Sequence, residues 1–231
     1  AYHQTGLNNP LDDAIIASAK QVKVDIGSEQ KVNEIPYDFV RKRLSVVVSN
    51  ADGKHTLITK GALQQILSVC INVQSEDNTS PLDEKIRADI EKRYSDWSEK
   101  GFRVLGIAVK NMDDRAQSYS RTDEKELGFA GFLLFFDPPK SDAKQIITDL
   151  AKRGVQIKII TGDNHKVAKH VADTVELPLL GILTGRELNE LHDEALWHAV
   201  ERTTIFAEVD PNQKERIILA LQKKNHVVGY M

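Results

Sequence analysis

The sequence predicts an α/β protein in two parts: an antiparallel-sheet domain with helices, followed by a doubly wound domain on a parallel sheet. Two observations predict this fold class. From Val22 to Gly61 the residues follow the period of strands, and Asn50–Gly53 is a hairpin turn signal between two of them. From Ser141 on, helical segments alternate strictly with short apolar runs, which is typical of a parallel sheet with crossover helices.

A double proline separates the two parts. Pro138 and Pro139 follow the strongly apolar run Gly128–Phe136, and two prolines directly after a strand fix the backbone and end regular structure. We therefore expect a hinge here, with one domain at residues 1–135 and a second at residues 136–231.

Composition and charge are those of an ordinary globular protein. The 231 residues are 41% hydrophobic and 28% charged, and 31 basic against 34 acidic side chains give a net charge of −3. This balance gives no indication of binding to nucleic acid or to a membrane surface. No apolar run approaches the roughly 18 residues that span a bilayer, and no signal peptide is visible, so we expect a soluble, cytosolic polypeptide. The single cysteine, Cys70, is interpreted as a buried small hydrophobe.

The first domain is expected to begin with a helix. Asn9 before Pro10, with Asp12 and Asp13 in the first turn, is a strong helix start. Further along the chain we expect strands at Leu44–Val48 and His55–Thr59, a strand end at Lys60–Ala62, a helix over Leu63–Ile71, a loop at Ser75–Ser80, a helix at Leu82–Lys100, a strand at Phe102–Val109, a surface loop or short helix at Asn111–Leu127 and a strand at Gly128–Phe136.

The second domain is expected to alternate helices and strands. In chain order these are a helix at Ser141–Arg153, a strand at Val155–Ile160, a helix at Lys166–Val175, a short strand at Ile182–Leu183, a helix at Glu187–Val200, a strand at Thr204–Val209, a helix at Pro211–Lys224 and a strand at His226–Met231.

The loop after the strand Val155–Ile160 is expected to carry chemistry. In open α/β sheets ligands bind beyond the carboxyl ends of strands, and Thr161, Gly162 and Asp163 follow this strand directly. Gly162 allows close backbone approach, Thr161 offers a hydroxyl, and the next helix presents free N–H groups to an anion. The alternative is a tight turn in which Asp163 or Asn164 caps that helix, and these residues alone favour neither interpretation.

Two features of the first domain suit a nucleotide. Tyr37–Arg43 combines aromatic side chains with three cations, which fits stacking on a purine and binding of its phosphates. A basic edge strand with two core aromatics explains the same residues equally well. Lys60 lies before a helix start, where the dipole disfavours a cation unless an anion shares the site, so it is a better ligand candidate than an ordinary surface lysine.

Five short motifs, in this order and with these gaps, resemble those of P-type ATPases. They are KGA at Lys60–Ala62, GFRVLGIA at Gly101–Ala108, DPPK at Asp137–Lys140, TGDN at Thr161–Asn164 and DPNQK at Asp210–Lys214. The resemblance covers essentially the whole chain. It implies a nucleotide-binding domain at residues 1–135 and, at residues 136–231, part of a phosphorylation domain with the Rossmann-like fold of the haloacid dehalogenase superfamily. The run IPYDFVRKRLSVVV at Ile35–Val48 looks most like the magnesium-transporting branch.

The resemblance implies roles in nucleotide binding for residues of the first domain. Tyr37 occupies the aromatic position that stacks on adenine, and Asp12 matches an acidic residue near the adenine amino group. Arg103 resembles the arginine that contacts the phosphates. The other members of the nucleotide-binding set are Lys42, or Arg41 if the register slips by one, together with Lys60, Gly61 and Asp137.

The resemblance also implies a phosphoryl site in the second domain. Thr161, Gly162 and Asp163 match the residues that hold the transferring phosphoryl group. Lys214 resembles the lysine that neutralises it, although a lysine at the start of a helix after Pro211 could otherwise be plain surface charge.

The implied activity is that of a P-type ion-transporting ATPase that uses ATP and Mg²⁺. The γ-phosphoryl group would pass in line to an aspartate, with Thr161, Lys214 and magnesium stabilising the developing charge while the hinge at Asp137–Pro139 closes. The DKTGT motif that carries this aspartate and the Gly-Asp-Gly loop that helps to hold magnesium do not occur in these residues. We therefore expect no metal ligand set here, and a fragment that binds nucleotide but is inactive alone.

The implied partners are ATP and the remainder of the same polypeptide, its actuator and membrane domains. The fragment would lie at the cytoplasmic face of the plasma or inner membrane, as part of an integral membrane protein. The alternatives are a calcium or proton pump of the same family, a nucleotide-binding regulatory module that never had a catalytic half, and a soluble dehalogenase-type phosphatase with a large cap.

Overall fold

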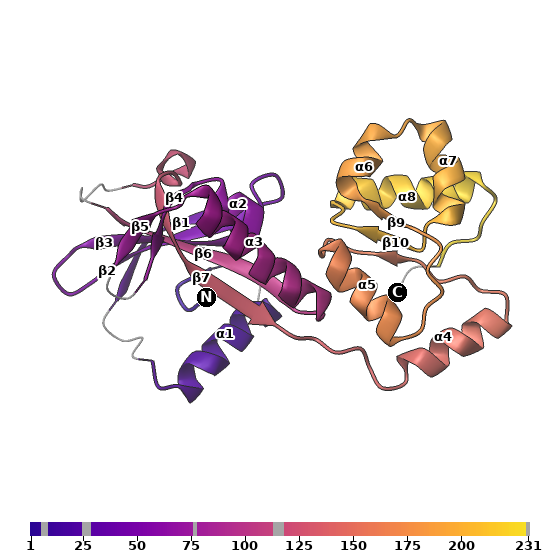
Figure 1. Cartoon of the computed structure of the whole chain (residues 1–231), viewed down its shortest axis with the longest axis horizontal. Helices are drawn as coiled ribbons and strands as arrows, with labels where there is room; N and C mark the ends of the chain where they lie inside the picture. Colours follow the sequence, from indigo (N-terminus) through magenta and orange to yellow (C-terminus); the bar gives the residue numbers. More distant parts are fainter. Residues whose placement is uncertain (6–8, 25–28, 76–77, 113–117, 230–231) are drawn as a thin grey trace. The chain divides into compact units, whose positions relative to one another are not determined.

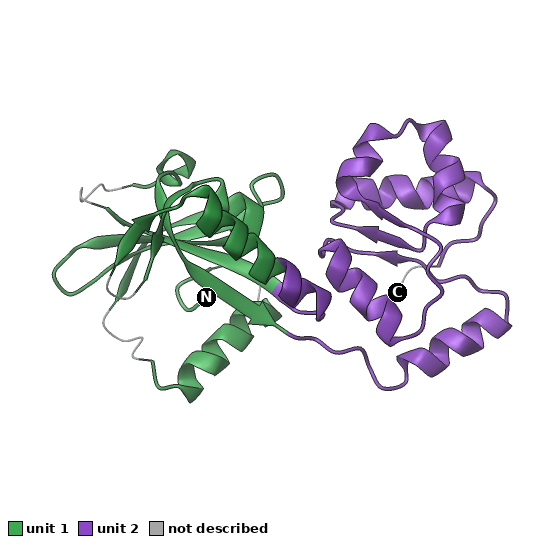
Figure 2. Cartoon of the chain, viewed as in Figure 1, with its two compact units in different colours: residues 1–94, 104–135 green, residues 95–103, 136–231 purple. Residues whose placement is uncertain are grey.

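A computed structural model describes residues 1–5, 9–24, 29–75, 78–112 and 118–229 of the chain. These residues form two compact units (Figure 2). Unit 1 contains residues 1–94 and 104–135, and unit 2 contains residues 95–103 and 136–231. Both units combine helices with a β-sheet, so the predicted α/β class is confirmed.

Unit 1 is built on one seven-stranded sheet (Figure 1). Its strands are β1 (Gln30–Asp38), β2 (Arg43–Ser49), β3 (His55–Ala62), β4 (Cys70–Gln74), β5 (Thr79–Pro81), β6 (Arg103–Met112) and β7 (Leu127–Phe135). The strand order is β1-β2-β3-β6-β7-β4-β5. The pairs from β1 to β6 are antiparallel, as the hairpin signal predicts, whereas β4 and β7 are parallel. The sheet is thus mixed rather than wholly antiparallel.

Helices cover both faces of this sheet. They are α1 (Pro10–Gln21), α2 (Leu63–Leu67) and α3 (Glu84–Glu99), with a 3-10 turn, η1, at Arg121–Asp123. On one face the main core joins α2 and α3 to the strands through buried residues that include Val47, Leu57, Ile66 and Ile90. The other face carries a smaller apolar cluster of Leu44, Val46 and Val48. On this face the first turn of α1 meets the sheet, where its Asp12 pairs with Lys60 of β3 (Figure 1).

Two expectations for the middle of unit 1 are wrong. The apolar run from Leu63 is not one helix to Ile71, because α2 ends at Leu67 and Cys70 begins β4. Cys70, Asn72 and Val73 pair with β7, and this long-range pairing outweighs the helical spacing of the preceding apolar residues. The expected loop Ser75–Ser80 also contains part of β5, which pairs with β4 at the edge of the sheet, while residues 76–77 lie outside the described residues.

The segment after β6 is less exposed than its polar composition predicts. Residues 113–117 lie outside the described residues, and η1 is the short helix allowed for in the expected loop Asn111–Leu127. Tyr119 is only 7% exposed and Glu124 only 3% exposed. A surface loop was therefore the wrong expectation for these two residues.

Unit 2 has a three-stranded parallel sheet with helices on both faces. The strands are β8 (Ile159–Ile160), β9 (Ile182–Thr184) and β10 (Ile205–Ala207), in the order β8-β10-β9. The helices are α4 (Ala143–Lys152), α5 (His165–Thr174), α6 (Gly185–Glu190), α7 (Asp193–Arg202) and α8 (Pro211–Lys223). Phe206 packs against α6, α7 and α8, whereas its neighbours Ile205 and Ala207 pack with residues of α4 and α5.

Three expectations for unit 2 need correction. Only the last two residues of Val155–Ile160 form a strand, because only they find a ladder partner in the short β10, and Val155 is 47% exposed. The helix expected at Glu187–Val200 is two helices, since Leu191 has extended backbone and Asp193 and Glu194 start a new first turn. The part of the expected strand His226–Met231 that the structure describes, residues 226–229, has no strand structure, and residues 230–231 lie outside the described residues.

Cys70 has the character expected of a buried hydrophobe, and this gives a first prediction. Its side chain is buried, and burial raises the pKa of the thiol to about 12. An exposed thiol has a pKa of about 8.5. At pH 8 we therefore expect iodoacetamide to leave Cys70 unmodified in the native chain and to modify it in denaturant, as measured by intact mass.

The control for this prediction moves the thiol by two residues. Ser68 is exposed, so the double variant Ser68→Cys, Cys70→Ser should react in the native state. Equal rates for the native parent and this variant would contradict the buried placement of Cys70.

Candidate functional site

In unit 2, the predicted Thr161-Gly162-Asp163 loop lies at the carboxyl end of β8. The Thr161 N–H donates to the Phe206 carbonyl at 2.9 Å, and the Thr161 carbonyl accepts from Val209 N–H at 3.1 Å. The Asp163 carbonyl accepts from Glu208 N–H at 2.9 Å. The loop is therefore bonded along its length to the chain that leaves β10.

The side chains of this loop also hold each other. The Thr161 hydroxyl donates to Asp163 Oδ2 at 3.1 Å and accepts from the Asp163 N–H at the same distance. Asn164, and not Asp163, caps α5, since its Oδ1 accepts from Lys166 N–H at 2.8 Å. Asp163 therefore does not cap α5. Its carboxylate and the Thr161 hydroxyl lie at the carboxyl end of β8.

Lys214 lies in the helix that starts at the same edge of the sheet. Asp210 caps α8 in a capping box with Gln213, and Pro211 is the first helical residue, which explains why the helix begins there. The Lys214 side chain is half-buried. Within the described part of the chain its ammonium group forms no ion pair or side-chain hydrogen bond. Residues 208 and 209, which directly precede the cap of α8, are bonded to the Thr161–Asp163 loop. Lys214, whose ammonium group has no ionic partner among the described residues, therefore lies in the helix that follows this bonded segment.

Sequence reasoning missed three residues at this edge. Glu208 has a positive φ of 60°, and its carboxylate lies 2.8 Å from His165 Nδ1 and accepts the His165 N–H at 3.3 Å. A Cβ on Gly185 would lie 2.6 Å from the Glu208 carbonyl, so only glycine fits the turn from β9 into α6. The N-cap signal of Thr184, with Glu187 three residues later, could have marked Gly185 as the start of a helix, whereas nothing in the sequence distinguishes Glu208 or His165.

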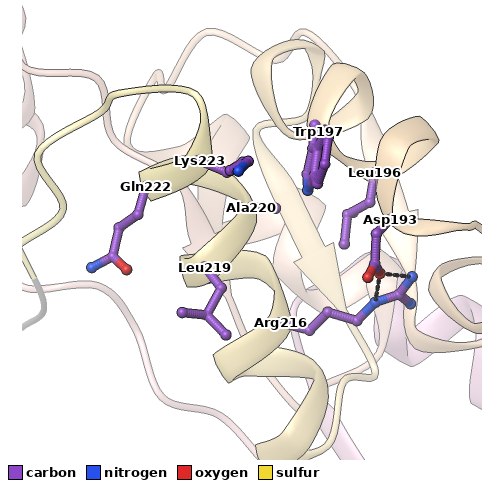
Figure 3. A pocket seen from close by; sticks show the side chains of 8 residues that line it. All are labelled: Asp193, Leu196, Trp197, Arg216, Leu219, Ala220, Gln222 and Lys223. Carbon is purple, nitrogen blue, oxygen red and sulfur yellow. Dashed lines mark hydrogen bonds and ion pairs between the residues drawn. The ribbon is translucent and has the colours of Figure 1, made fainter.

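Two hollows of unit 2 are compared with this edge through the residues that line them. One groove lies between α7 and α8 and is lined by Trp197, Leu219, Lys223 and an Arg216–Asp193 ion pair, none of them a predicted site residue (Figure 3). A second, shallow hollow adjoins the carboxyl edge, and its lining residues are His165, Ile182, Thr184, Arg186, Glu187 and Glu190.

In unit 1, the predicted aromatic residues are exposed. Tyr37 is 47% exposed and Phe39 is 65% exposed, and their rings pack edge to face with centroids 5.5 Å apart. The alternative of two core aromatics is therefore wrong, although β1 is an edge strand as that alternative supposed. Tyr37 lies beside the turn that joins β1 to β2, at an irregularity in the register between Ile35 and Asp38.

The structure distinguishes the two candidate cations of this turn. Arg41 bonds to the carboxylates of Asp38 and Glu124 and donates to the Pro36 carbonyl at 2.8 Å. Burial lowers the pKa of Arg41, but its bonds to Glu124 and Asp38 raise it more, so the net shift is upward. Lys42 has a φ of 46° and, among the described residues, forms no ion pair. Lys42 is the cation of this turn that is available to an anionic ligand.

Lys60 and Asp12 come together, but not as the sequence predicts. Both are 8% exposed, and they form an ion pair with each other, while the Lys60 ammonium also lies 3.3 Å from Gln4 Oε1. The anion that we expected beside Lys60 is the carboxylate of Asp12, a residue of the protein itself. In the pairing of β2 with β3, Lys60 lies opposite Leu44. In the pairing of β1 with β2, Pro36 and Tyr37 are the two unpaired residues between the partners of Ser45 and Arg43.

Gly61 allows a close approach of β3 to the β1–β2 turn. The Ala62 N–H donates to the Lys42 carbonyl at 3.0 Å. A Cβ on Gly61 would lie 2.5 Å from that carbonyl oxygen and 2.6 Å from the Cβ of Arg43. The glycine of the KGA motif is thus required by packing.

The remaining predicted residues lie in unit 2. Arg103 Nε is 3.2 Å from Asp163 Oδ1, with side chains 51% and 32% exposed. Asp137 is exposed, in a segment without regular structure, and bonds to no described residue. Within unit 2 the structure therefore groups Arg103 with the loop Thr161–Asp163, whereas no bond among the described residues connects Asp137 to that loop.

The described residues contain no group of three or more His, Cys, Asp or Glu side chains that could hold a metal ion. Within the same residues, every helix is too short or too polar to cross a lipid bilayer.

Comparisons with known proteins agree on one family. The family model "P-type ATPase, cytoplasmic domain N" matches residues 3–142. Magnesium-transporting ATPase, P-type 1, of Salmonella typhimurium is 38% identical over 236 residues, and its Escherichia coli K12 counterpart is 37% identical over 233 residues; each alignment covers 100% of this chain and 26% of the relative. Calcium-transporting ATPase 1 of Saccharomyces cerevisiae is 31% identical, covering 98% of this chain and 25% of its own length. The chain thus spans about a quarter of the length of these relatives.

The crowding at Gly61 predicts a specific loss of stability. A methyl group there must displace the Lys42 carbonyl and Arg43, so Gly61→Ala should lower the free energy of unfolding of unit 1 by about 1–3 kcal/mol, measured by urea denaturation. Gly128→Ala in β7 is the matched control, because the nearest atom to its Cβ would be Gln74 Oε1 at 3.4 Å, an ordinary contact. Equal effects of the two substitutions would contradict the close approach.

Proposed function

Because the chain belongs to the P-type ATPase family, we propose that it is the ATP-binding part, with a portion of the phosphorylation domain, of an ion-transporting ATPase. Residues 1–135 would be the nucleotide-binding domain. Residues 136–231 would be part of a phosphorylation domain of the haloacid dehalogenase type. The observation that carries this proposal is the alignment of the whole chain with P-type ATPases at 37–38% identity.

The exposed aromatic turn of unit 1 supports nucleotide binding. Tyr37 presents about half of its surface, and Lys42 of the same turn has no ionic partner among the described residues. A purine stacks on an aromatic face, and a nearby cation suits its phosphates. The Asp12 carboxylate of α1, which pairs with Lys60 of β3, would accept a hydrogen bond from an amino group of the base.

The carboxyl edge of unit 2 supports a phosphoryl site. Parallel sheets with helices on both faces bind ligands at this edge, where Thr161, Asp163 and Lys214 lie. The Thr161 hydroxyl would donate to an equatorial oxygen of the γ-phosphoryl group, and Lys214 would neutralise it. The acceptor aspartate would lie outside these residues. Movement would occur at Asp137–Pro139, where the chain has no regular structure.

Magnesium enters this proposal in two ways. Mg²⁺ bound to ATP would offset phosphate charge during transfer, and its ligands would lie largely outside this chain. Magnesium is also the proposed transported ion, since the relatives at 37–38% identity are named magnesium-transporting. Calcium is the second candidate, supported by the 31% identity to the yeast calcium-transporting ATPase. The parts that would select the ion lie outside this chain.

Titration calorimetry tests the first step of this function. We expect ATP and ADP to bind the 231-residue chain with modest affinity. No heat at millimolar ATP would defeat the assignment of unit 1. For the transported ion, the longer reading frame that contains this chain should restore growth at low magnesium to cells without their own magnesium transporters. Rescue of calcium tolerance alone would favour the second candidate.

Substitution of Tyr37 tests the stacking role. Tyr37→Ala removes the ring, and base–aromatic stacking contributes about 1–3 kcal/mol, so ATP affinity should fall about 5- to 150-fold. Tyr37→Phe keeps the ring and should bind like the parent. Phe39→Ala, which removes the neighbouring exposed ring, is the control for a general loss of apolar surface. If Tyr37→Ala binds ATP normally and Phe39→Ala does not, the adenine site is at Phe39.

A phosphorylation experiment tests the assignment of the acceptor. With no DKTGT motif in these residues, the chain alone should give no acid-stable phosphoenzyme from γ-labelled ATP and no ATP turnover. A labelled band that disappears in Asp163→Asn would show that a carboxylate of this chain accepts the phosphoryl group.

A further inference from the structure

Glu124 is a charged residue in the interior of unit 1 that no motif identifies. Its side chain is 0% exposed, and its side-chain partners lie 79 to 83 residues away along the chain. Its Oε2 binds Arg41 Nη1 and, at 2.9 Å, Arg43 Nε, while its Oε1 accepts the Ser45 hydroxyl at 2.7 Å. Both oxygens are therefore used by the β1–β2 turn and the strand that follows it.

Arg41 links Glu124 to other residues of the β1–β2 turn. Its guanidinium connects Glu124 to the Asp38 carboxylate and to the Pro36 carbonyl. Asp38 Oδ1 in turn accepts the N–H groups of Val40 and Arg41 at 3.0 and 2.6 Å. The turn is thus held from its inner side by one chain of charge-assisted hydrogen bonds that begins at Glu124.

Tyr37 and Lys42, which are proposed to bind nucleotide, are next in sequence to the residues that this chain of bonds holds. Tyr37 precedes Asp38 directly, and Lys42 stands between the two arginines that Glu124 binds. The left-handed backbone of Lys42, with its φ of 46°, is a conformation that a lysine adopts only when its surroundings impose it. Glu124, through Arg41 and Arg43 on either side, supplies such surroundings.

We propose that Glu124 is a positioning residue for nucleotide binding, which fixes the β1–β2 turn so that Tyr37 and Lys42 face the ligand together. This inference rests on the proposed function of unit 1. Glu124 does not touch the nucleotide. It acts by removing the alternative conformations of the turn, so the ligand does not have to order the turn when it binds.

The test compares Glu124→Gln with Glu126→Gln. Glutamine keeps the size of Glu124 and an acceptor for Ser45, but it removes the charge that holds two arginines. Glu126 is exposed and has only a surface ion pair to Lys110 at 3.7 Å, so its substitution is the matched control. We expect ATP affinity to fall about tenfold in Glu124→Gln and to stay unchanged in Glu126→Gln, measured by calorimetry on chains shown by circular dichroism to be folded.

Non-additivity separates positioning from a general loss of stability. If Glu124 acts by placing Tyr37, then Glu124→Gln should cost little further affinity in a chain that already carries Tyr37→Ala. Fully additive losses would overturn the inference, as would parental ATP affinity in folded Glu124→Gln. If the parent chain itself does not bind ATP, the proposed function fails, which is a distinct result.

A second variant covers the case in which Glu124→Gln does not fold. Arg41→Lys keeps a positive charge beside Glu124 but cannot donate to Glu124, Asp38 and the Pro36 carbonyl at once. We expect it to fold and to show a similar loss of ATP affinity. Parental affinity in folded Arg41→Lys would overturn the inference.

Discussion

A buried carboxylate needs compensation, and in unit 1 this requirement organises the edge of the sheet. An unpaired charge in a protein interior is too costly to persist, so Glu124 can be fully buried only where donors converge on it. Arg41, Arg43 and Ser45 provide them. These bonds hold Glu124, in the segment after β6, against the β1–β2 turn. They therefore connect two parts of the chain that are far apart in sequence. The register of the hairpin and the close contact at Gly61 hold the same turn against β3.

Local signals predicted much of the fold. The helix that begins at Pro10 was predicted because Asn9 caps it and Asp12 and Asp13 favour its dipole, and all of these contacts are within one turn. The β2–β3 hairpin followed from its turn residues in the same way. Where partners distant in sequence decide the structure, prediction failed. Cys70 belongs to a strand because β7 is available to pair with it, and the local pattern of apolar residues contains no information about β7.

The candidate sites show the same division. The motifs and the run Ile35–Val48 predicted Thr161, Asp163, Lys60 and Lys42 as site residues, because their residue types and spacing are visible in the sequence. The states of these residues were not visible. Only the folded chain shows that Lys60 is already neutralised by Asp12, that Arg41 is occupied by internal carboxylates and that Lys42 is not. Glu124 lies in a polar run whose composition predicts a surface, so no sequence pattern marks it as buried.

The crowding at Gly185 has a mechanical consequence for the carboxyl edge of unit 2. The carbonyl of Glu208 leaves no room for a side chain on Gly185, while the N–H of Glu208 is bonded to Asp163. Gln213 then joins Gly185 to the start of α8 through a 2.7 Å hydrogen bond. These contacts join the loop at Asp163, the turn from β9 into α6 and the start of α8 in one network. A side chain added at Gly185 would press on the Glu208 carbonyl, and because the N–H of the same residue is bonded to Asp163, the strain would reach the loop after β8 as well.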